Sequence, residues 1–205
     1  MTTQRRKPNR ADKRRQERSK PRIHSFQLPG RPIQKMTADW VAVDIDNGHV
    51  RFVFGQQGIA TGQNCPALVA GMIVHVAKSN VLRWLHEPGT LRFYNSTQEF
   101  AQKHGVEACL GSTDSVKQPP MERLAHVSAT VLISGRALED AEILFYYIAP
   151  FTVHERQTAQ DDLTPQDVEP VVSISLPLGY LLGLMKELYS VNSSSVTQEL
   201  EEALK

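Results

Sequence analysis

Eight basic side chains near the N-terminus are the residues of this sequence whose type and spacing point most directly to a ligand. Residues 1–22 hold almost no apolar side chains and cannot offset the entropy of ordering, so we expect them to be disordered when free. Because no aromatic residue is interleaved with the cations, contact with nucleic acid would be electrostatic and independent of sequence. The predicted nucleic-acid-binding residues are Arg5, Arg6, Lys7, Arg10, Lys13, Arg14, Arg15 and Arg18.

The charge of the chain is split between this basic arm and the remainder. Residues 1–35 contain twelve Lys or Arg against Asp12 and Glu17, whereas the remaining chain contains eleven against twenty, which gives about +10 and about −9. An acidic body repels a phosphate backbone, so nucleic acid would have to meet the arm or a local patch. Two other interpretations stay open: the arm only keeps the chain soluble, or it contacts an acidic protein surface.

Residues that hold metals in other proteins are present, but they do not fall in a recognisable motif. No two of the seven histidines have H-x-x-x-H spacing, and we expect His75 and His126 to point outward from their strands. Asp44, Asp46 and Gly48 begin like a calcium loop, but the glycine is one place early and no Glu follows at the twelfth position. The sequence therefore predicts no metal and no other cofactor.

Catalytic residues and targeting signals are also not predicted. Cys65 and Cys109, the only cysteines, form neither a C-x-x-C motif nor a disulfide framework, which favours a reducing, cytoplasmic setting. The N-terminus lacks the apolar stretch of a secretory signal, and the apolar run at 171–185 is too short to span a membrane. An enzyme would need a site assembled in space, for example with general acids among Asp161, Asp162, Asp167 and Glu169.

The first half of the body is predicted to begin with a hairpin. Residues 40–54 alternate around Asn47-Gly48, which is the strongest short hairpin signal. Pairing Asp46 with His49 places Val41, Val43 and Ile45 opposite Phe54, Phe52 and Val50 on the core face, and Asp44 opposite Arg51 as an ion pair.

The rest of this half is predicted as a loop, a strand and helices. Residues 55–71 form a long loop and 72–76 a third strand, and a helix capped by Ser79 or Asn80 ends at Pro88-Gly89. Residues 90–94 are an edge strand. A capping box at Ser96 begins a helix that reaches His104 and stops at Gly105.

The second half repeats this order. Residues 125–134 and 141–149 form a second hairpin, 150–170 a second long, more acidic loop, and 171–190 a strand that runs into a helix at Pro177. In that helix Gly179 and Gly183 allow a close backbone contact with the sheet or with the helix of the other half. A polar break at 192–195 precedes a last helix with Val196, Leu200 and Leu204 on one face.

The two halves also match in sequence. Residues 73–87 overlay on 173–187 without a gap, so that Val74 matches Ile174 and Glu87 matches Glu187. We therefore predict an α+β fold with two similar β-β-loop-β-α halves packed as a pseudo-symmetric body, preceded by a disordered basic arm. The predicted units are 1–35 (arm and linker), 36–105 (first half), 106–124 (Pro-rich connector) and 125–205 (second half with a C-terminal helix).

The second half resembles a small bacterial family of unknown function. The residues concerned are ILFYY at 143–147 and EPVVSISLPLGYLLGLMKELY at 169–189, within a stretch of about 141–190 that is matched again at 49–87. The shared order is an aromatic-bearing strand, a variable loop, a strand ending near a Pro, and a helix with a Leu-Leu pair. The resemblance implies an architecture and no chemistry, and the basic arm and the Pro-rich connector depart from it.

We expect a non-enzymatic accessory or regulatory protein of a bacterial nucleic-acid-handling system, with the arm on nucleic acid and the long loops on a protein partner. The alternative is an adaptor or inhibitor that acts wholly by protein contact, through residues 150–170 or the last helix. An enzyme of unidentified type is the third alternative. No membrane contact is expected, and a homo-oligomer is compatible with every one of these functions.

Overall fold

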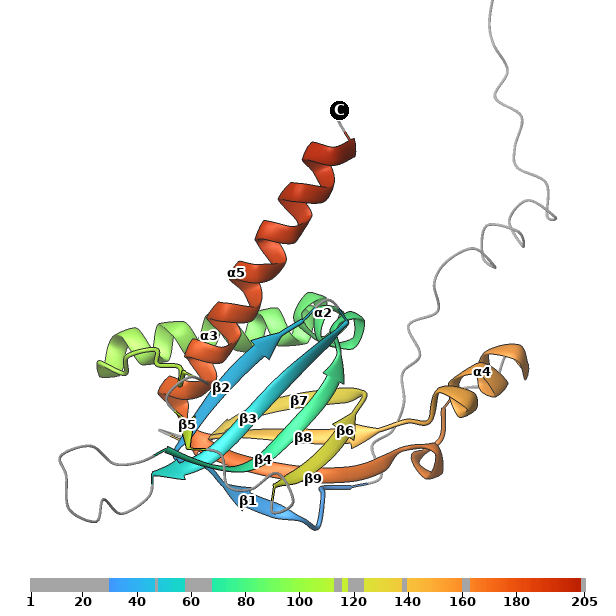
Figure 1. The fold of residues 1–205 in the computed structure, drawn as a ribbon, viewed down its shortest axis with the longest axis horizontal. Helices are drawn as coiled ribbons and strands as arrows, with labels where there is room; N and C mark the ends of the chain where they lie inside the picture. Colours follow the sequence, from blue (N-terminus) through green and yellow to red (C-terminus); the bar gives the residue numbers. More distant parts are fainter. Residues whose placement is uncertain are drawn as a thin grey trace, which may run out of the picture.

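A computed structural model describes residues 30–46, 48–57, 68–112, 116–117, 124–137, 140–159 and 163–203. Within these ranges the chain forms an α+β fold with two mixed β-sheets and four α-helices (Figure 1). The strands are β1 (Lys35–Thr37), β2 (Trp40–Ile45), β3 (His49–Gln57), β4 (Leu68–Ala77), β5 (Val116–Lys117), β6 (Ala125–Ala129), β7 (Val131–Ala137), β8 (Asp140–Tyr147) and β9 (Glu169–Pro177). The helices are α2 (Lys78–His86), α3 (Pro88–His104), α4 (Pro150–Ala159) and α5 (Leu178–Ala203), with a short 3₁₀ helix η3 (Pro165–Asp167).

Each sheet has three antiparallel strands and a parallel strand donated by the other part of the chain, and the first sheet also contains the short β5. The first sheet has the order β2-β3-β4, and β6 lies parallel to β4 along its edge, next to the short β5. The second sheet has the order β7-β8-β9, and β1 lies parallel to β9. Both β4 and β9 would otherwise present unpaired backbone groups at a sheet edge, and the donated strands satisfy these groups.

The chain passes from one sheet to the other at two places. After β1, the amide of Ala38 donates to Ser175 in the second sheet, and the next amide, of Asp39, donates to the Gly55 carbonyl in the first sheet. After β6, the amide of Thr130 donates to the Tyr146 carbonyl in the second sheet. At each crossing consecutive residues are therefore hydrogen-bonded into different sheets.

The registers of the two sheets correspond residue by residue. A shift of 91 residues carries 35–55 onto 126–146, a shift of 100 carries 69–77 onto 169–177, and the strand pairs within these ranges recur. Even the irregularities correspond, because β3 is bulged between Phe54 and Gly55 and β8 between Phe145 and Tyr146. Residues 58–67 and 149–167, which connect the equivalent strands, differ in length by nine.

The main core lies between the sheets and contains side chains from both. Phe52 and Phe54 of β3 contact Phe145 of β8, with ring centroids 5.9 Å apart in each case, and all three rings are fully buried. Helices α2 and α5 add the apolar faces that contain Val81, Leu85, Leu181, Leu184, Met185 and Leu188. Burying three aromatic rings in one cluster supplies several kcal/mol that neither sheet would gain alone.

The predicted first hairpin is confirmed, including its register. Asp46 accepts the backbone N–H of His49, Val41 lies opposite Phe54, and Asp44 is ion-paired with Arg51 across the strands. The opposite face of β2 is also buried, because Trp40 and Ala42 belong to a second apolar cluster with Tyr180. Alternation predicts one buried face, and it missed this second cluster.

The predicted edge strand at residues 90–94 is wrong, since this segment lies within α3. Helix α3 begins at Pro88, because proline is favoured in the first turn of a helix. Pro88, which was predicted to end one helix, therefore also begins the next. Ser96 lies in the middle of α3, where its hydroxyl donates to the Phe93 carbonyl, and it caps no helix. The predicted end is confirmed, because Gly105 adopts a left-handed φ of 69°.

Three predictions for the second half are wrong. Residues 125–134 are two strands in different sheets, with the crossing at Thr130, so only β7 and β8 form a hairpin. The predicted loop 150–170 contains α4 and η3. Helix α5 continues through the polar residues 192–195 to Ala203, because an established helix propagates through residues of modest propensity. The strand-to-helix unit itself is confirmed.

Gly179 and Gly183 make a close contact, but with a different element from the one predicted. The extended segment 107–111 crosses α5 at these glycines, and the amide of Cys109 donates to the Gly179 carbonyl at 3.0 Å. A Cβ atom on Gly183 would overlap the Cys109 carbonyl oxygen. The same segment reaches β2, where the amide of Gly111 donates to Val41.

The last residues before β1 are tied to the second sheet. The Tyr146 hydroxyl donates to the Gly30 carbonyl, and Arg31 lies 3.4 Å from the Glu142 carboxylate. The linker residues before Gly30 lie outside the described residues, together with the arm. Among the helices of the described ranges, none is both long enough and apolar enough to cross a membrane.

We predict that Gly183→Ala destabilises the protein by about 2–3 kcal/mol, because the added methyl group overpacks a contact with backbone that cannot rotate away. Gly89→Ala is the matched control: it is also a helical glycine, but no atom lies within 4 Å of the added Cβ. Urea unfolding of both variants measures the difference. Equal stability of Gly183→Ala and the native chain would contradict the close contact.

Candidate functional site

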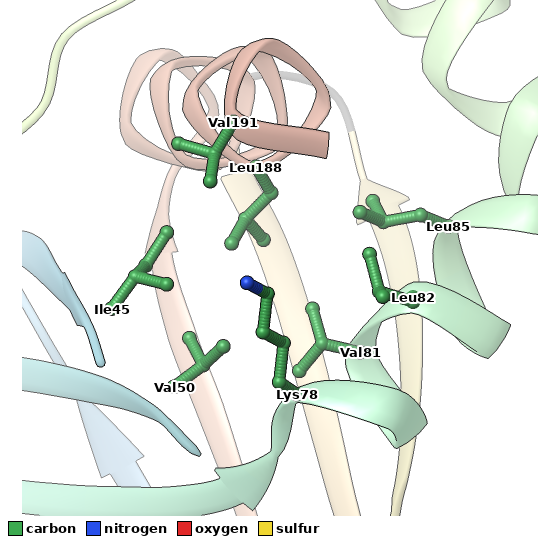
Figure 2. Close-up of a pocket in the computed structure, with 8 residues that line it drawn as sticks. All are labelled: Ile45, Val50, Lys78, Val81, Leu82, Leu85, Leu188 and Val191. Atoms are coloured by element: carbon green, nitrogen blue, oxygen red, sulfur yellow. The ribbon is translucent and has the colours of Figure 1, made fainter. Parts of the chain in front are cut away.

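An apolar hollow lies where the β2–β3 hairpin, α2 and α5 meet. Its enclosed volume of about 10 Å³ has room for about one water molecule, and the rest of the depression is open to solvent. Figure 2 shows its walls, which come from the hairpin, from the first two turns of α2 and from α5. The lining residues are Ile45, Val50, Lys78, Val81, Leu82, Leu85, Leu188 and Val191.

The hairpin turn fixes the rim of this hollow. The Asp46 carboxylate accepts the backbone N–H groups of Gly48 and His49, and these two bonds lower the pKa of Asp46. The Gly48 carbonyl then accepts the amide of Lys78 at 2.9 Å, which ties the start of α2 to the turn. The aspartate that resembled a calcium ligand in sequence therefore has a structural role in the turn.

Lys78 is the only charged residue in the lining. Its ammonium group extends into the space between Ile45, Leu188 and Val191 (Figure 2). Within the described part of the chain this group has no ion pair or hydrogen bond, while the surrounding walls are aliphatic. The depression is too small to enclose a ligand, so the ammonium group lies among apolar walls at the protein surface.

A polar row lies on the outer face of the first sheet. His75 and His126 point outward as predicted, their rings are stacked at 5.3 Å, and His75 Nε2 lies 3.0 Å from His126 Nδ1. Burial of the His75 ring, then the nearby His126 and Arg51, lower the pKa of His75, which favours a neutral ring that shares a hydrogen bond with its neighbour. No third ligand joins them, because the described residues contain no group of three or more His, Cys, Asp or Glu suited to a metal.

Cys109 offers little nucleophilic reactivity. Burial and the adjacent Glu107 raise the pKa of Cys109, so its thiol is less ionised at neutral pH than an ordinary cysteine. Cys65 lies outside the described residues.

The acidic residues considered as general acids are not brought together. Asp161 and Asp162 lie outside the described residues, and Glu169 begins β9 on the surface. Asp167 accepts hydrogen bonds from the backbone N–H and the hydroxyl of Thr164, both at 2.7 Å, and from Arg156. The Thr164 backbone bond, then its hydroxyl and Arg156, lower the pKa of Asp167 to about 2, so this carboxyl holds no proton to donate at neutral pH.

The eight predicted nucleic-acid-binding residues lie outside the described residues; they are Arg5, Arg6, Lys7, Arg10, Lys13, Arg14, Arg15 and Arg18.

The hollow was not predicted from the sequence. A signal was present in the overlay of the two halves, because Pro88 follows Glu87 and interrupts the first helix, whereas Leu188 follows Glu187 and continues the second. The helix after the break covers one side of the body only.

Comparisons with protein-family models, with curated proteins and with solved structures find no match to this chain.

We predict that the pKa of Asp167 rises from about 2 toward its ordinary value of 3.8 in Thr164→Ala, because one of its hydrogen bonds is lost. Since the pKa is lower in the folded state, Asp167 stabilises η3 fully above pH 3.8, and this contribution disappears as the pH falls through about 2. Carboxyl ¹³C NMR titration measures both values. Thr158→Ala on α4 is the control, because its hydroxyl bonds His154 and not Asp167; an unchanged Asp167 pKa in Thr164→Ala would contradict the assignment.

Proposed function

We propose that this chain is a non-enzymatic accessory or regulatory protein of a bacterial nucleic-acid-handling system. Its basic arm contacts nucleic acid, and its acidic body serves as a scaffold that meets a protein partner. The observation that carries the proposal is the charge split, about +10 in residues 1–35 and about −9 in the remainder. A body of that charge repels a phosphate backbone, so contact with nucleic acid comes mainly from the arm or from a local patch.

We further propose that the body arose by internal duplication and consists of two pseudo-symmetric halves, 36–105 and 125–205. The residue-by-residue correspondence of the strand pairs, together with the shared bulge, supports this origin. The halves share one core and exchange their first strands, so they function as a single rigid scaffold.

The hollow fits a binding role better than a catalytic one. Its lining is aliphatic apart from the Lys78 ammonium, and a lysine without a neighbouring acid or base has no partner for proton transfer. A shallow apolar depression that contains one cation is suited to contact with the surface of another chain and not to enclosing a substrate. The proposed function therefore relies on contacts made by the arm and by the surface of the body.

We predict that removing residues 1–22 lowers affinity for both duplex DNA and single-stranded RNA at least tenfold at low salt. It also flattens the slope of log affinity against log salt by up to about 7 units, as expected for eight lost phosphate contacts. Fluorescence anisotropy across a salt series measures both quantities. An arm with its residues in scrambled order is the control and keeps the affinity; a truncated chain that binds as tightly as the full chain contradicts the proposal.

A second candidate function is an adaptor or inhibitor that acts by protein contact alone. Phe151 favours it, because this ring on α4 is 69% exposed within the segment that the sequence predicts as an acidic loop. Aromatic residues of this kind often anchor protein interfaces.

Under this second function, Phe151→Asp removes the partner that co-purifies with the native chain, as measured by quantitative mass spectrometry. Glu155→Asp, a conservative change at an exposed position of the same helix, is the control and keeps the partner. If the partner depends on nucleic acid and is lost after nuclease treatment, the first function holds and the second does not.

A further inference from the structure

Two histidines meet on the outer face of the first sheet, where the donated strand β6 joins β4. His75 lies on β4 and His126 on β6, and these strands run parallel and side by side (Figure 1). His75 Nε2 lies 3.0 Å from His126 Nδ1, so one ring donates a hydrogen bond to the other. The histidine pair therefore links the donated strand to the sheet that receives it.

The junction between β1 and β9, which is equivalent to this one in the second sheet, has different residues at the same positions. The shifts of 100 and 91 residues that relate the two sheets carry His75 onto Ser175 and Lys35 onto His126. Neither a lysine nor a serine changes its charge between about pH 5 and pH 7, whereas histidine does. The histidine pair is thus not required by the fold, and it gives a sensitivity to protons to one of the two junctions.

The hydrogen bond between the rings exists only while at least one of the facing nitrogens is without a proton. Two neutral rings, or one neutral and one protonated ring, meet this condition, because one ring donates and the other accepts. When both rings are protonated, both facing nitrogens carry a hydrogen atom, and two positive charges face each other across the strands. Protonation of both histidines therefore converts an attraction between β4 and β6 into a repulsion.

The surroundings of His75 oppose its protonation. Arg51 lies directly opposite His75 on β3 and is itself ion-paired with Asp44. Burial of the His75 ring is the largest cause that lowers its pKa below the ordinary value of 6.5, followed by the nearby His126, Arg51 and His49. The charged and titratable groups around the pair on the described strands and their turn are Asp44 on β2, Asp46 in the turn, which favours protonation, and His49 and Arg51 on β3.

Strand β6 is the part of the first sheet best able to separate from it. Three of its five residues, Ala125, His126 and Ser128, are exposed, and only Ala129 is buried. Within the described chain β6 pairs with β4 alone, whereas β4 also has β3 on its other side. An edge strand with few buried side chains opens at a lower free energy than the core.

We propose that the His75–His126 pair is a pH-dependent switch that holds β6 on β4 at neutral pH and releases it in acid. In the closed form the two rings share a hydrogen bond. In the open form both rings are protonated and β6 has left β4, whose backbone groups are then free to pair with another strand. This inference goes beyond the proposed function and does not depend on binding of nucleic acid or of a protein partner.

The direction of the pH effect follows from His75. Because its pKa in the closed form is lower than 6.5, the closed form binds fewer protons than the open form. The closed form is therefore fully stable above pH 6.5. It loses stability as the pH falls below this value, until His75 is protonated in the closed form as well.

The test compares two equivalent amides of the full-length chain by NMR-detected hydrogen exchange at about pH 7.5 and about pH 5. Ala129 ends β6, and the shift of 91 residues relates it to Ala38, which donates to the Ser175 carbonyl after β1. Protection factors are compared, because they correct for the pH dependence of the intrinsic exchange rate. We predict that the protection factor of Ala129 falls roughly tenfold at the lower pH, while that of Ala38 changes by less than about twofold.

Two variants assign the effect to the pair. His75→Gln and His126→Gln each replace a titratable ring by a neutral side chain that still forms hydrogen bonds, and each reduces the fall at Ala129 to about twofold or less. Native protection of Ala38 at about pH 7.5 shows that these variants are folded. His154→Gln, at an exposed position of α4, is the matched control and keeps the full effect.

Equal protection of Ala129 at both pH values would overturn the proposal, and so would an undiminished fall in His75→Gln. A fall of the same size at Ala38 would also overturn it, because the pair would then contribute to the stability of the whole fold without releasing β6.

Discussion

The exchange of edge strands between the two sheets is the constraint on which the rest of this structure depends. Without β1, the edge of β9 would be open, and without β6 so would the edge of β4. Each sheet obtains its missing strand from the other part of the chain, so neither can complete its backbone hydrogen bonds alone. The crossings at Ala38–Asp39 and at Thr130 convert two small sheets into one cooperative unit.

The interlocked strands also explain where the core lies. Because the sheets are joined at both crossings, their inner faces are held together, and the three phenylalanines of β3 and β8 fill the space between them. The helices then cover the remaining apolar surface, α5 beside β2 and α2 beside β7. Apart from the connections 58–67 and 149–167, the two halves are alike to this point, and they diverge again after Glu87 and Glu187. That divergence leaves the hollow on one side of the body.

Local signals in the sequence predict the parts of the fold that are determined locally. The Asn-Gly turn and strict alternation were enough to give the register of β2 and β3, and the Gly105 stop was readable from its residue type. The edge strand predicted at 90–94 failed because Thr90, Phe93 and Tyr94 have strand propensity, while Pro88 and packing against α5 favour a helix. Tertiary contacts decided that segment.

The strand exchange and the hollow could not be predicted from local sequence patterns, because both depend on contacts between residues far apart in the chain. Residues 125–134 look like one strand, since nothing at Thr130 marks a passage between sheets; the passage is specified by hydrogen bonds to Tyr146 and Ile148, far along the chain. The hollow forms from a hairpin, α2 and α5, and more than a hundred residues separate the hairpin from α5. The Glu87-Pro88 and Glu187-Leu188 pairs indicate that the first helix breaks and the second continues. Where the helix after the break packs is known only from the position of α3 in the structure.

Native-state hydrogen exchange at four amides tests most directly whether the halves are one unit. Ala38, Asp39, Thr130 and Ser173 donate the backbone bonds at or beside the crossings. If the sheets are interlocked, all four exchange only through global unfolding, with the same free energy and the same dependence on denaturant. If Thr130 exchanges through a lower-energy opening that leaves Ala38 and Ser173 protected, the halves unfold separately and the interlocked scaffold is contradicted.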